Sequence, residues 1–252
     1  MNNRDNILSM NVDCIEYPNA LKLIKDWSKE PISRYVCISN VHMCMETYDS
    51  SSFKSIVNDC DLNLPDSSVI RKAQNLLTGC KLGPTKGGVD LVLDLCCIAE
   101  KESISIGFYG STEEILLKMT SKILSIYPNL KITSVISPPF RGLTTEELSN
   151  DIDAISNSGT QILFVGLGCP KQEKWMAQNK KNLHCTMIGV GAAFSFLAGA
   201  IKPSPYWVHE YGLEWLYRLF VEPKRLWKRY FKHNPRFLYY IIKIILKKYW
   251  TD

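Results

Sequence analysis

The sequence predicts an α/β protein with a largely parallel sheet, helices on both faces, and a helical C-terminal appendage. Short apolar runs alternate with longer stretches of helical periodicity, which is the rhythm of βαβ units. Several apolar runs end in glycine, which is typical of a strand that turns into the next helix. A length of 252 residues fits one sizeable core and an appendage. We therefore expect an α/β catalytic core at 1–200 and the appendage at 201–252.

The expected strands are runs of mostly apolar residues, at 34–40, 103–110, 130–137, 161–168 and 184–191. A further strand-like segment begins at Leu62 and ends before Asp66, and a helical run containing Arg71 follows it. The other expected core helices lie at 88–101, 112–126, 144–157 and 171–180. Ligands of open parallel sheets bind beyond the carboxyl ends of the strands, so the turns after these strands are where we expect the site.

The appendage concentrates positive charge and aromatic residues. From Ile201 onward there are eleven Lys or Arg against four Asp or Glu, a net charge of +7, whereas residues 1–200 carry −2. Pro223 and Pro235 predict two short helices, at 224–233 and 236–250, each with a cationic stripe beside an apolar face. This pattern is typical of helices that lie in a membrane interface. The alternative is a helical hairpin that packs on the core and keeps its lysines in water.

Other partners of a basic surface have less support. The longest uninterrupted apolar run near the end, 237–242, is much shorter than the roughly 20 residues that span a bilayer, so membrane contact should be peripheral. The core has no zinc-finger, RRM or helix-turn-helix signature, and the tail aromatics cluster in a way that suits lipid better than bases. We therefore expect no nucleic-acid partner.

The cysteines and histidines give no sign of a metal or a covalent nucleophile. The nine cysteines are odd in number, and the charged N-terminus does not resemble a signal sequence, so we expect reduced thiols in the cytosol. No C-x2-C spacing recurs. The four histidines have no obvious Ser or Cys partner: His42, His184, His209 and His233.

A glycine-rich turn follows the expected strand at 161–168. Gly168 permits close backbone approach, and the free N–H groups of the following helical turn, with Lys171 beside them, suit phosphate oxygens. The alternative is a well-built helix start in which Glu173 complements the helix dipole and Trp175 packs into the core. The turns at Gly110 and at 189–191 are similarly open, but neither matches a dinucleotide fingerprint.

Asp66 is the best candidate for a catalytic carboxylate. It stands at the end of the strand-like segment and before a helical run, where it can take a proton from an attacking sugar hydroxyl. The competing interpretation is an N-cap of that helix, since Asp is favoured there.

Five ordered segments together resemble the WecG/TagA/CpsF glycosyltransferase family. They are PD at 65–66, GVDL at 88–91, VGLGCPKQEKW at 165–175, GVGAAFSFLAG at 189–199 and GLEWLYRLFVEPKRLWKRY at 212–230, and the resemblance covers about 7–231. It implies a Rossmann-like core with a membrane-targeting appendage. It also implies an inverting transferase that moves a sugar from a UDP-sugar to a polyprenyl-diphosphate-linked sugar, in bacterial surface polysaccharide biosynthesis. Such a protein would be cytoplasmic and peripheral on the inner face of the plasma membrane; homo-oligomer formation is left open.

The resemblance also implies roles for individual residues. Asp66 matches the catalytic base and Asn40 a residue of the donor-sugar pocket, while Gln172 would contact the donor. Three arginines would hold the diphosphates and neutralise the departing UDP without a metal or cofactor: Arg218, Arg225 and Arg229. The remaining substrate-binding candidates are Lys86, Gly110, Gly168, Lys171, Glu173 and Ser195.

The chain departs from the family pattern around the donor sugar. Ser67 replaces a usual Gly, Ser195 replaces a usual Asp, and Lys86 stands near a usual Arg, which it replaces as a point charge without the planar fork. Glucose, galactose, glucuronic acid or another hexose is therefore expected as readily as N-acetylmannosamine.

Two other functions remain open. A metal-dependent glycosyltransferase would use Asp59 and Asp61 as a D-x-D diphosphate clamp, although this short pattern recurs at Asp151 and Asp153. A non-catalytic nucleotide-binding module anchored by the basic tail would follow if the departures had removed catalysis.

Overall fold

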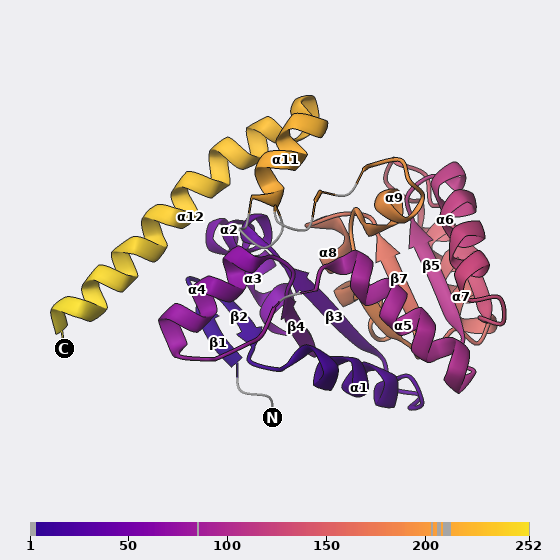
Figure 1. Ribbon diagram of the computed structural model, residues 1–252. Helices are drawn as coiled ribbons and strands as arrows, with labels where there is room; N and C mark the ends of the chain where they lie inside the picture. Colours follow the sequence, from indigo (N-terminus) through magenta and orange to yellow (C-terminus); the bar gives the residue numbers. More distant parts are fainter. Residues whose placement is uncertain (1–3, 85, 203, 206–207, 209–212, 252) are drawn as a thin grey trace.

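Six parallel strands form the central sheet, in the order β4-β3-β8-β7-β5-β6 (Figure 1). The computed structural model describes residues 4–84, 86–202, 204–205, 208 and 213–251. The sheet strands are β3 (Arg34–Ser39), β4 (Leu62–Pro65), β5 (Ile106–Gly110), β6 (Ile132–Ile136), β7 (Ile162–Gly166) and β8 (Thr186–Gly189). The predicted α/β fold with a largely parallel sheet is confirmed, and each strand lies inside the run that predicted it.

Helices cover both faces of the sheet because successive strand residues point to opposite sides. Tyr35 and Cys37 belong to one core cluster, whereas Val36 and Ile38 belong to the other. The first cluster is completed by α2 (Val41–Asp49), α3 (Ser51–Asn58), α4 (Ser68–Thr78), α7 (Thr145–Asn157) and α8 (Lys171–Asn179). The second is completed by α1 (Tyr17–Trp27), α5 (Gly88–Glu102), α6 (Glu113–Ile126) and α9 (Ala193–Leu197).

An antiparallel hairpin of β1 (Arg4–Ile7) and β2 (Met10–Asp13) precedes the sheet, and the sequence did not predict it. Its two strands have four residues each and no strong alternation. Long-range hydrogen bonds hold it in place: the Arg4 guanidinium donates to the Asn58 and Cys60 carbonyls (2.9 and 2.6 Å), and the buried Asp13 accepts the Asn63 backbone N–H at 2.7 Å. Local sequence patterns do not report contacts of this kind.

The appendage contains α11 (Glu214–Val221) and α12 (Pro223–Thr251), and α12 runs along one side of the core (Figure 1). The prediction of two short helices separated at Pro235 is wrong, since α12 continues through this proline. An internal proline costs about 3 kcal/mol. Leu226 and Tyr230 before it and Phe237 and Ile241 after it are buried along one stripe, and this packing offsets the cost.

Packing on α2 fixes the position of α12. Phe237 and Ile241 join the core cluster to which α2 contributes, and Arg236 forms a bidentate ion pair with Asp49 at the end of α2 (2.6 and 2.8 Å). Among the described residues, no helix combines the length and apolar character that a membrane crossing requires.

The expectation of nine reduced cysteines is wrong for one pair. Cys14, after β2, and Cys80, after α4, form a disulfide across a sequence separation of 66 residues. An odd number of cysteines means that at least one is unpaired, but it does not show which distant cysteines the fold brings together. The other seven are free thiols, five of them buried.

Candidate active site

Asn40 and Asp66 lie next to each other at the carboxyl edge of the sheet. Parallel pairing aligns Ser39 of β3 with Pro65 of β4, so the residues that follow each strand are neighbours. The Asp66 backbone N–H donates to the Ser39 carbonyl at 2.7 Å, which extends this pairing by one step. Asn40 is the N-cap of α2, and its side-chain oxygen accepts the Met43 N–H at 3.1 Å.

The Asp66 carboxylate is hydrogen-bonded to the start of α5 and does not cap α4, the helix that follows Asp66 in the sequence. Its Oδ1 accepts the Gly88 backbone N–H at 3.1 Å. Ser67 is the N-cap of α4, where its hydroxyl accepts the Ile70 N–H at 3.3 Å, so the interpretation of Asp66 as that N-cap is wrong. The positive end of the α5 dipole stabilises negative charge at this position.

A cleft joins this edge of the sheet to the appendage. It holds about 600 Å³ of space, part of it open to solvent. The core side contributes Asn40, Val41, His42, Asp66, Ser67, Ser68 and Val69, and the appendage side contributes Glu214, Trp215, Arg218, Arg229, Tyr230 and Asn234. Four residues that the sequence predicted as a site therefore lie in one cleft: Asn40, Asp66, Arg218 and Arg229.

The two arginines in the cleft have spare hydrogen-bonding capacity. Arg218 lies 5.4 Å from the centre of the Phe196 ring and 3.6 Å from Glu222, and Arg229 donates to the Tyr230 hydroxyl at 3.4 Å. The buried Nε atom of each has no hydrogen-bond partner among the described residues. Guanidinium groups in this state suit an anion that brings several acceptor oxygens.

The third predicted arginine is not in the cleft. Arg225 is more than half exposed and pairs with Glu222 at 2.7 Å. The structure thus separates Arg225 from Arg218 and Arg229, although all three belong to one sequence block.

Gln172 connects two loops and does not line the cleft. Its buried Oε1 accepts backbone N–H groups from Gly168 (3.1 Å) and Gly191 (3.0 Å), and its Nε2 donates to Glu173 at 2.7 Å. The turn after β7 is therefore tied to the turn after β8. A Cβ at Gly189 would lie 2.8 Å from Gln172 Nε2, so this arrangement requires a glycine there.

Glu173 is fully buried and does not reach the cleft. Burial raises the pKa of its carboxyl to about 7. Trp175, two residues on, stacks on Tyr109 with ring centroids 4.3 Å apart. The alternative interpretation, a helix start packed into the core, is therefore correct for Trp175. Glu173 lies in the first turn of α8 as that interpretation expected, but its side chain is buried in the interior.

The other predicted substrate-binding residues lie at the carboxyl edge but outside the cleft lining. Lys171 is exposed in the first turn of α8, and Ser195 is half-buried in α9. Gly168 has φ +80°, in the left-handed region. Gly110 has φ +114°, and a Cβ there would lie 2.7 Å from the Gly166 carbonyl carbon, so its small size serves strand packing.

Lys86 borders a neighbouring cleft, whose lining includes Pro65, the residue before Asp66. It pairs with Asp94 at 2.9 Å and lies 5.1 Å from the centre of the Tyr17 ring. Arg71, whose buried Nε has no hydrogen-bond partner among the described residues, lines the same cleft. The sequence placed Arg71 only in a helical run and missed this position.

Neither D-x-D pattern reaches the Asp66 cleft. Asp61 immediately precedes β4, whereas Asp66 immediately follows it, so the two lie at opposite edges of the sheet. Asp61 also pairs with Lys180 at 2.7 Å and accepts the Tyr35 N–H at 2.8 Å. Asp151 accepts the Tyr109 hydroxyl at 2.8 Å.

Two histidines meet where the sequence predicted no partners. The rings of His42 and His233 lie 5.0 Å apart, and His42 lines the cleft. Burial lowers the pKa of His42 to about 3 and that of His233 to about 4. His209 lies outside the described residues. The residues 42 and 233 are 191 positions apart, so no sequence spacing could have found this pair.

A carboxylate and two arginines that share a cleft at the carboxyl edge of a parallel sheet can accept a proton and bind an anionic ligand, which are the elements of an enzyme site. The sequence comparison gives the particular family. The profile of the glycosyl transferase WecG/TagA/CpsF family matches residues 5–251. The chain belongs to this family and is a glycosyltransferase.

Two curated relatives carry the same activity in their names. The N-acetylglucosaminyldiphosphoundecaprenol N-acetyl-beta-D-mannosaminyltransferase of Bacillus subtilis (strain 168) is 28% identical over 210 residues, covering 82% of this chain and 78% of the relative. The enzyme of the same name from Staphylococcus aureus (strain NCTC 8325 / PS 47) is 25% identical over 210 residues, covering 83% and 80%.

Proposed function

We propose that this glycosyltransferase moves a hexose from a UDP-sugar to a sugar linked to polyprenyl diphosphate, with inversion at the anomeric carbon. The relatives act, by their names, on a sugar linked to undecaprenyl diphosphate, which supports this acceptor class. The observation that carries the proposal is the cleft in which Asp66 lies with Arg218 and Arg229.

Asp66 acts as the general base. As the acceptor hydroxyl attacks the anomeric carbon, its proton passes to the Asp66 carboxylate, while the bond from that carbon to the UDP oxygen breaks. Proton removal by a positioned carboxylate contributes ~10² to 10⁴ in rate. The hydrogen bond from Gly88 and the start of α5 hold the group at the cleft.

Arg218 and Arg229 stabilise the charge that develops on the departing diphosphate. Each brings a permanent positive charge from the appendage into the cleft, so this chemistry needs the appendage in place. Asn40, on the opposite wall beside Asp66, is positioned to contact sugar hydroxyls. Arg225 lies outside this cleft in the present conformation, and its role in diphosphate binding stays a proposal.

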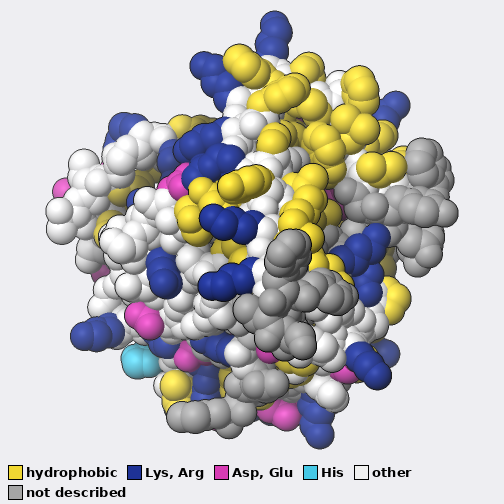
Figure 2. Space-filling model, turned by 90° about the vertical axis from the view of Figure 1, so that its left-hand side faces the viewer, with side chains coloured by type: hydrophobic (Ala, Val, Ile, Leu, Met, Phe, Trp, Pro, Cys, Tyr) yellow, Lys and Arg dark blue, Asp and Glu magenta, His cyan; other side chains and the backbone are white. Residues whose placement is uncertain are grey.

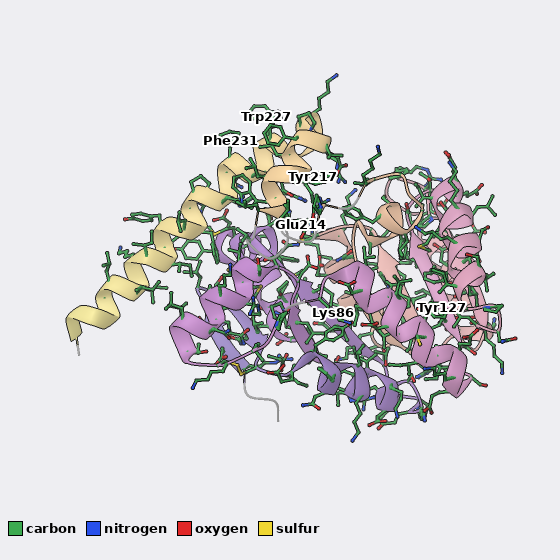
Figure 3. The ribbon with its side chains drawn as sticks, in the orientation of Figure 1. Lys86, Tyr127, Glu214, Tyr217, Trp227 and Phe231 are labelled. Carbon is green, nitrogen blue, oxygen red and sulfur yellow. A yellow bond between two sulfur atoms is a disulfide. The ribbon has the colours of Figure 1, made fainter. Side chains whose placement is uncertain are left out.

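The outer face of the appendage supports attachment to the cytoplasmic face of a membrane. Outside the cleft, the exposed large hydrophobic residues among the described side chains of α11 and α12 are Phe220, Val221, Trp227, Phe231, Leu238, Tyr239, Ile242, Ile244 and Leu246. Figure 2 shows hydrophobic side chains gathered on this side with Lys and Arg among them. Trp227 and Phe231 lie on the side of α12 away from the sheet (Figure 3). Such a surface suits an anionic bilayer.

Product formation tests the proposed function directly. The full chain would be incubated with a panel of UDP-hexoses and UDP-N-acetylhexosamines and a short polyprenyl-diphosphate-N-acetylglucosamine acceptor, and the product mass measured. We expect a mass gain of one hexosyl residue. No transfer from any UDP-sugar, or transfer that is abolished by EDTA and restored by Mg²⁺, would contradict the proposal in its donor or in its metal-independent mechanism.

A further inference from the structure

Three side chains of the kinds that bind metals meet where α12 packs on α2. His42 and Glu46 lie one turn apart on α2, and His233 comes from α12. Glu46 Oε1 lies 3.9 Å from His42 Nδ1 and 3.4 Å from His233 Nε2. One candidate ligand atom from each residue lies within 4.8 Å of the other two.

We propose that His42, Glu46 and His233 form a binding site for a divalent transition metal ion of the Zn²⁺ type. Two imidazoles and a carboxylate are ligands that Zn²⁺ prefers. Bonds of about 2.0–2.1 Å in tetrahedral geometry separate ligand atoms by about 3.4 Å. The Glu46 to His233 distance already has this value, and the His42 to Glu46 distance must shorten by about 0.5 Å. The two histidine ligand atoms lie within 4.8 Å of each other and must close to the same separation.

The orientation of His42 supports this proposal. Its Nδ1 is buried and has no hydrogen-bond partner among the described residues. The same nitrogen lies 3.9 Å from Glu46 Oε1, so it is turned toward the other candidate ligands and can offer its lone pair to an ion. A buried polar atom without a partner costs free energy, and an ion bound here would supply the partner that His42 Nδ1 lacks.

A cation bound at this position would need the negative charge of the Glu46 carboxylate, because the nearby side chains are positively charged. Arg229 and Lys232 lie close enough to act on both histidines, and they oppose a bound cation. Arg236 is largely neutralised by its pair with Asp49. Glu46 is the anionic member of the three ligands, so its charge should decide the affinity.

An ion at this site would join the two walls of the cleft. Asn40 stands two residues before His42, and Arg229 lies one helical turn before His233, and both line the cleft. The ion would fix the distance between them and hold the appendage on the core, with water in its fourth coordination position. This inference concerns binding and does not depend on which sugar is transferred.

Spectroscopic titration with Co²⁺ tests the site. The full chain without an affinity tag would be treated with EDTA, desalted and titrated with Co²⁺, whose visible bands are intense in tetrahedral N/O sites; Zn²⁺ would then compete. We expect one equivalent of Co²⁺, displaced by Zn²⁺, and affinity weakened at least about tenfold by Glu46→Gln or His233→Gln. His184→Gln, which removes an exposed histidine before β8, is the matched control and should bind as wild type does.

Two results would overturn the proposal. One is a wild-type chain that takes up no stoichiometric Co²⁺ or Zn²⁺. The other is a His233→Gln chain that binds as tightly as wild type. Should the His233 variant fail to fold, the wild-type titration and the Glu46→Gln variant still decide the matter. Zn²⁺ should also raise the Tm of wild type and of the His184 variant but not that of Glu46→Gln.

Discussion

The Asp66 carboxylate accepts a hydrogen bond from the Gly88 backbone N–H at 3.1 Å, which links the residue after β4 to the first turn of α5. This bond joins two segments that are 22 positions apart and fixes the acid at the cleft into which the appendage brings Arg218 and Arg229. The base of the proposed reaction thus comes from the first third of the chain, and its cations come from the C-terminal appendage.

The side chain of Asp66 should be needed for turnover but not for nucleotide binding. Asp66→Asn keeps an oxygen for the Gly88 N–H and removes the base, so kcat should fall by ~10² to 10⁴ while the Kd for UDP stays within about twofold. Steady-state kinetics and calorimetric UDP titration measure the two quantities. Asp59→Asn, at the opposite edge of the sheet, is the control and should retain full activity. A kcat of Asp66→Asn within tenfold of wild type would contradict the assigned role.

The two arginines of the cleft should act on the departing diphosphate. Arg218→Ala and Arg229→Ala should each lower kcat/KM by ~10² or more, because each removes a charged donor aimed at developing charge. Arg141→Ala, which removes an exposed arginine paired with Glu147, should change kcat/KM by less than about twofold. Equal losses in all three variants would show that the cleft arginines have no special function.

The exposed aromatic residues of α12 should determine membrane affinity. Full burial of one such side chain contributes ~1.5 to 3 kcal/mol, so the double variant Trp227→Ser, Phe231→Ser should lower partitioning onto anionic vesicles by ~100-fold. Co-sedimentation with phosphatidylglycerol vesicles measures this. Leu117→Ser, which changes an exposed residue of α6, is the control and should leave partitioning unchanged. Unchanged sedimentation of the double variant would exclude this face as the docking surface.

Glu173 should make the stability of the fold depend on pH. Burial raises the pKa of its carboxyl from 4.5 to about 7, so between these values the folded chain holds a proton that the unfolded chain has lost. Stability contributed by this group therefore falls as pH rises from 4.5 to about 7 and is constant above.

The variant Glu173→Gln removes this dependence. It should be more stable than wild type by about 3 kcal/mol at pH 8, and the gain should shrink strongly at pH 4.5. Guanidinium unfolding at both pH values gives the two differences, and their comparison cancels any direct packing effect of the amide. A gain of the same size at both pH values would show that Glu173 does not titrate in this window.

The periodic part of the chain was predictable because its signals are local. The β5, β7 and β8 strands are apolar runs, and α5 to α8 carry regular apolar faces between them, so sequence order alone gave their succession. The β1–β2 hairpin was not predictable, since Arg4 and Asp13 hold it through contacts with residues near position 60. Pro235 misled the prediction of the appendage because packing on both sides of it outweighs its local cost.

The candidate site divides in the same way. Sequence motifs and the family resemblance predicted that Asn40, Asp66, Arg218 and Arg229 belong to the site, and the structure brings these four together. Three features could not be predicted from the sequence, because they depend on which faces the packed helices turn inward. They are the burial of Gln172 and Glu173, the position of Arg225 outside the cleft, and the contact between His42 and His233.

By itself the sequence determined the alternation of strands and helices, the basic and aromatic character of the last fifty-two residues, and the family to which the chain belongs. Only the tertiary structure decided that α12 returns along α2, so that Arg229 faces Asp66 across one cleft while Trp227 and Phe231 stay exposed. The physical reason is that hydrophobic periodicity specifies a face for each helix, whereas the partner of that face is chosen by burial against segments nearly two hundred residues away.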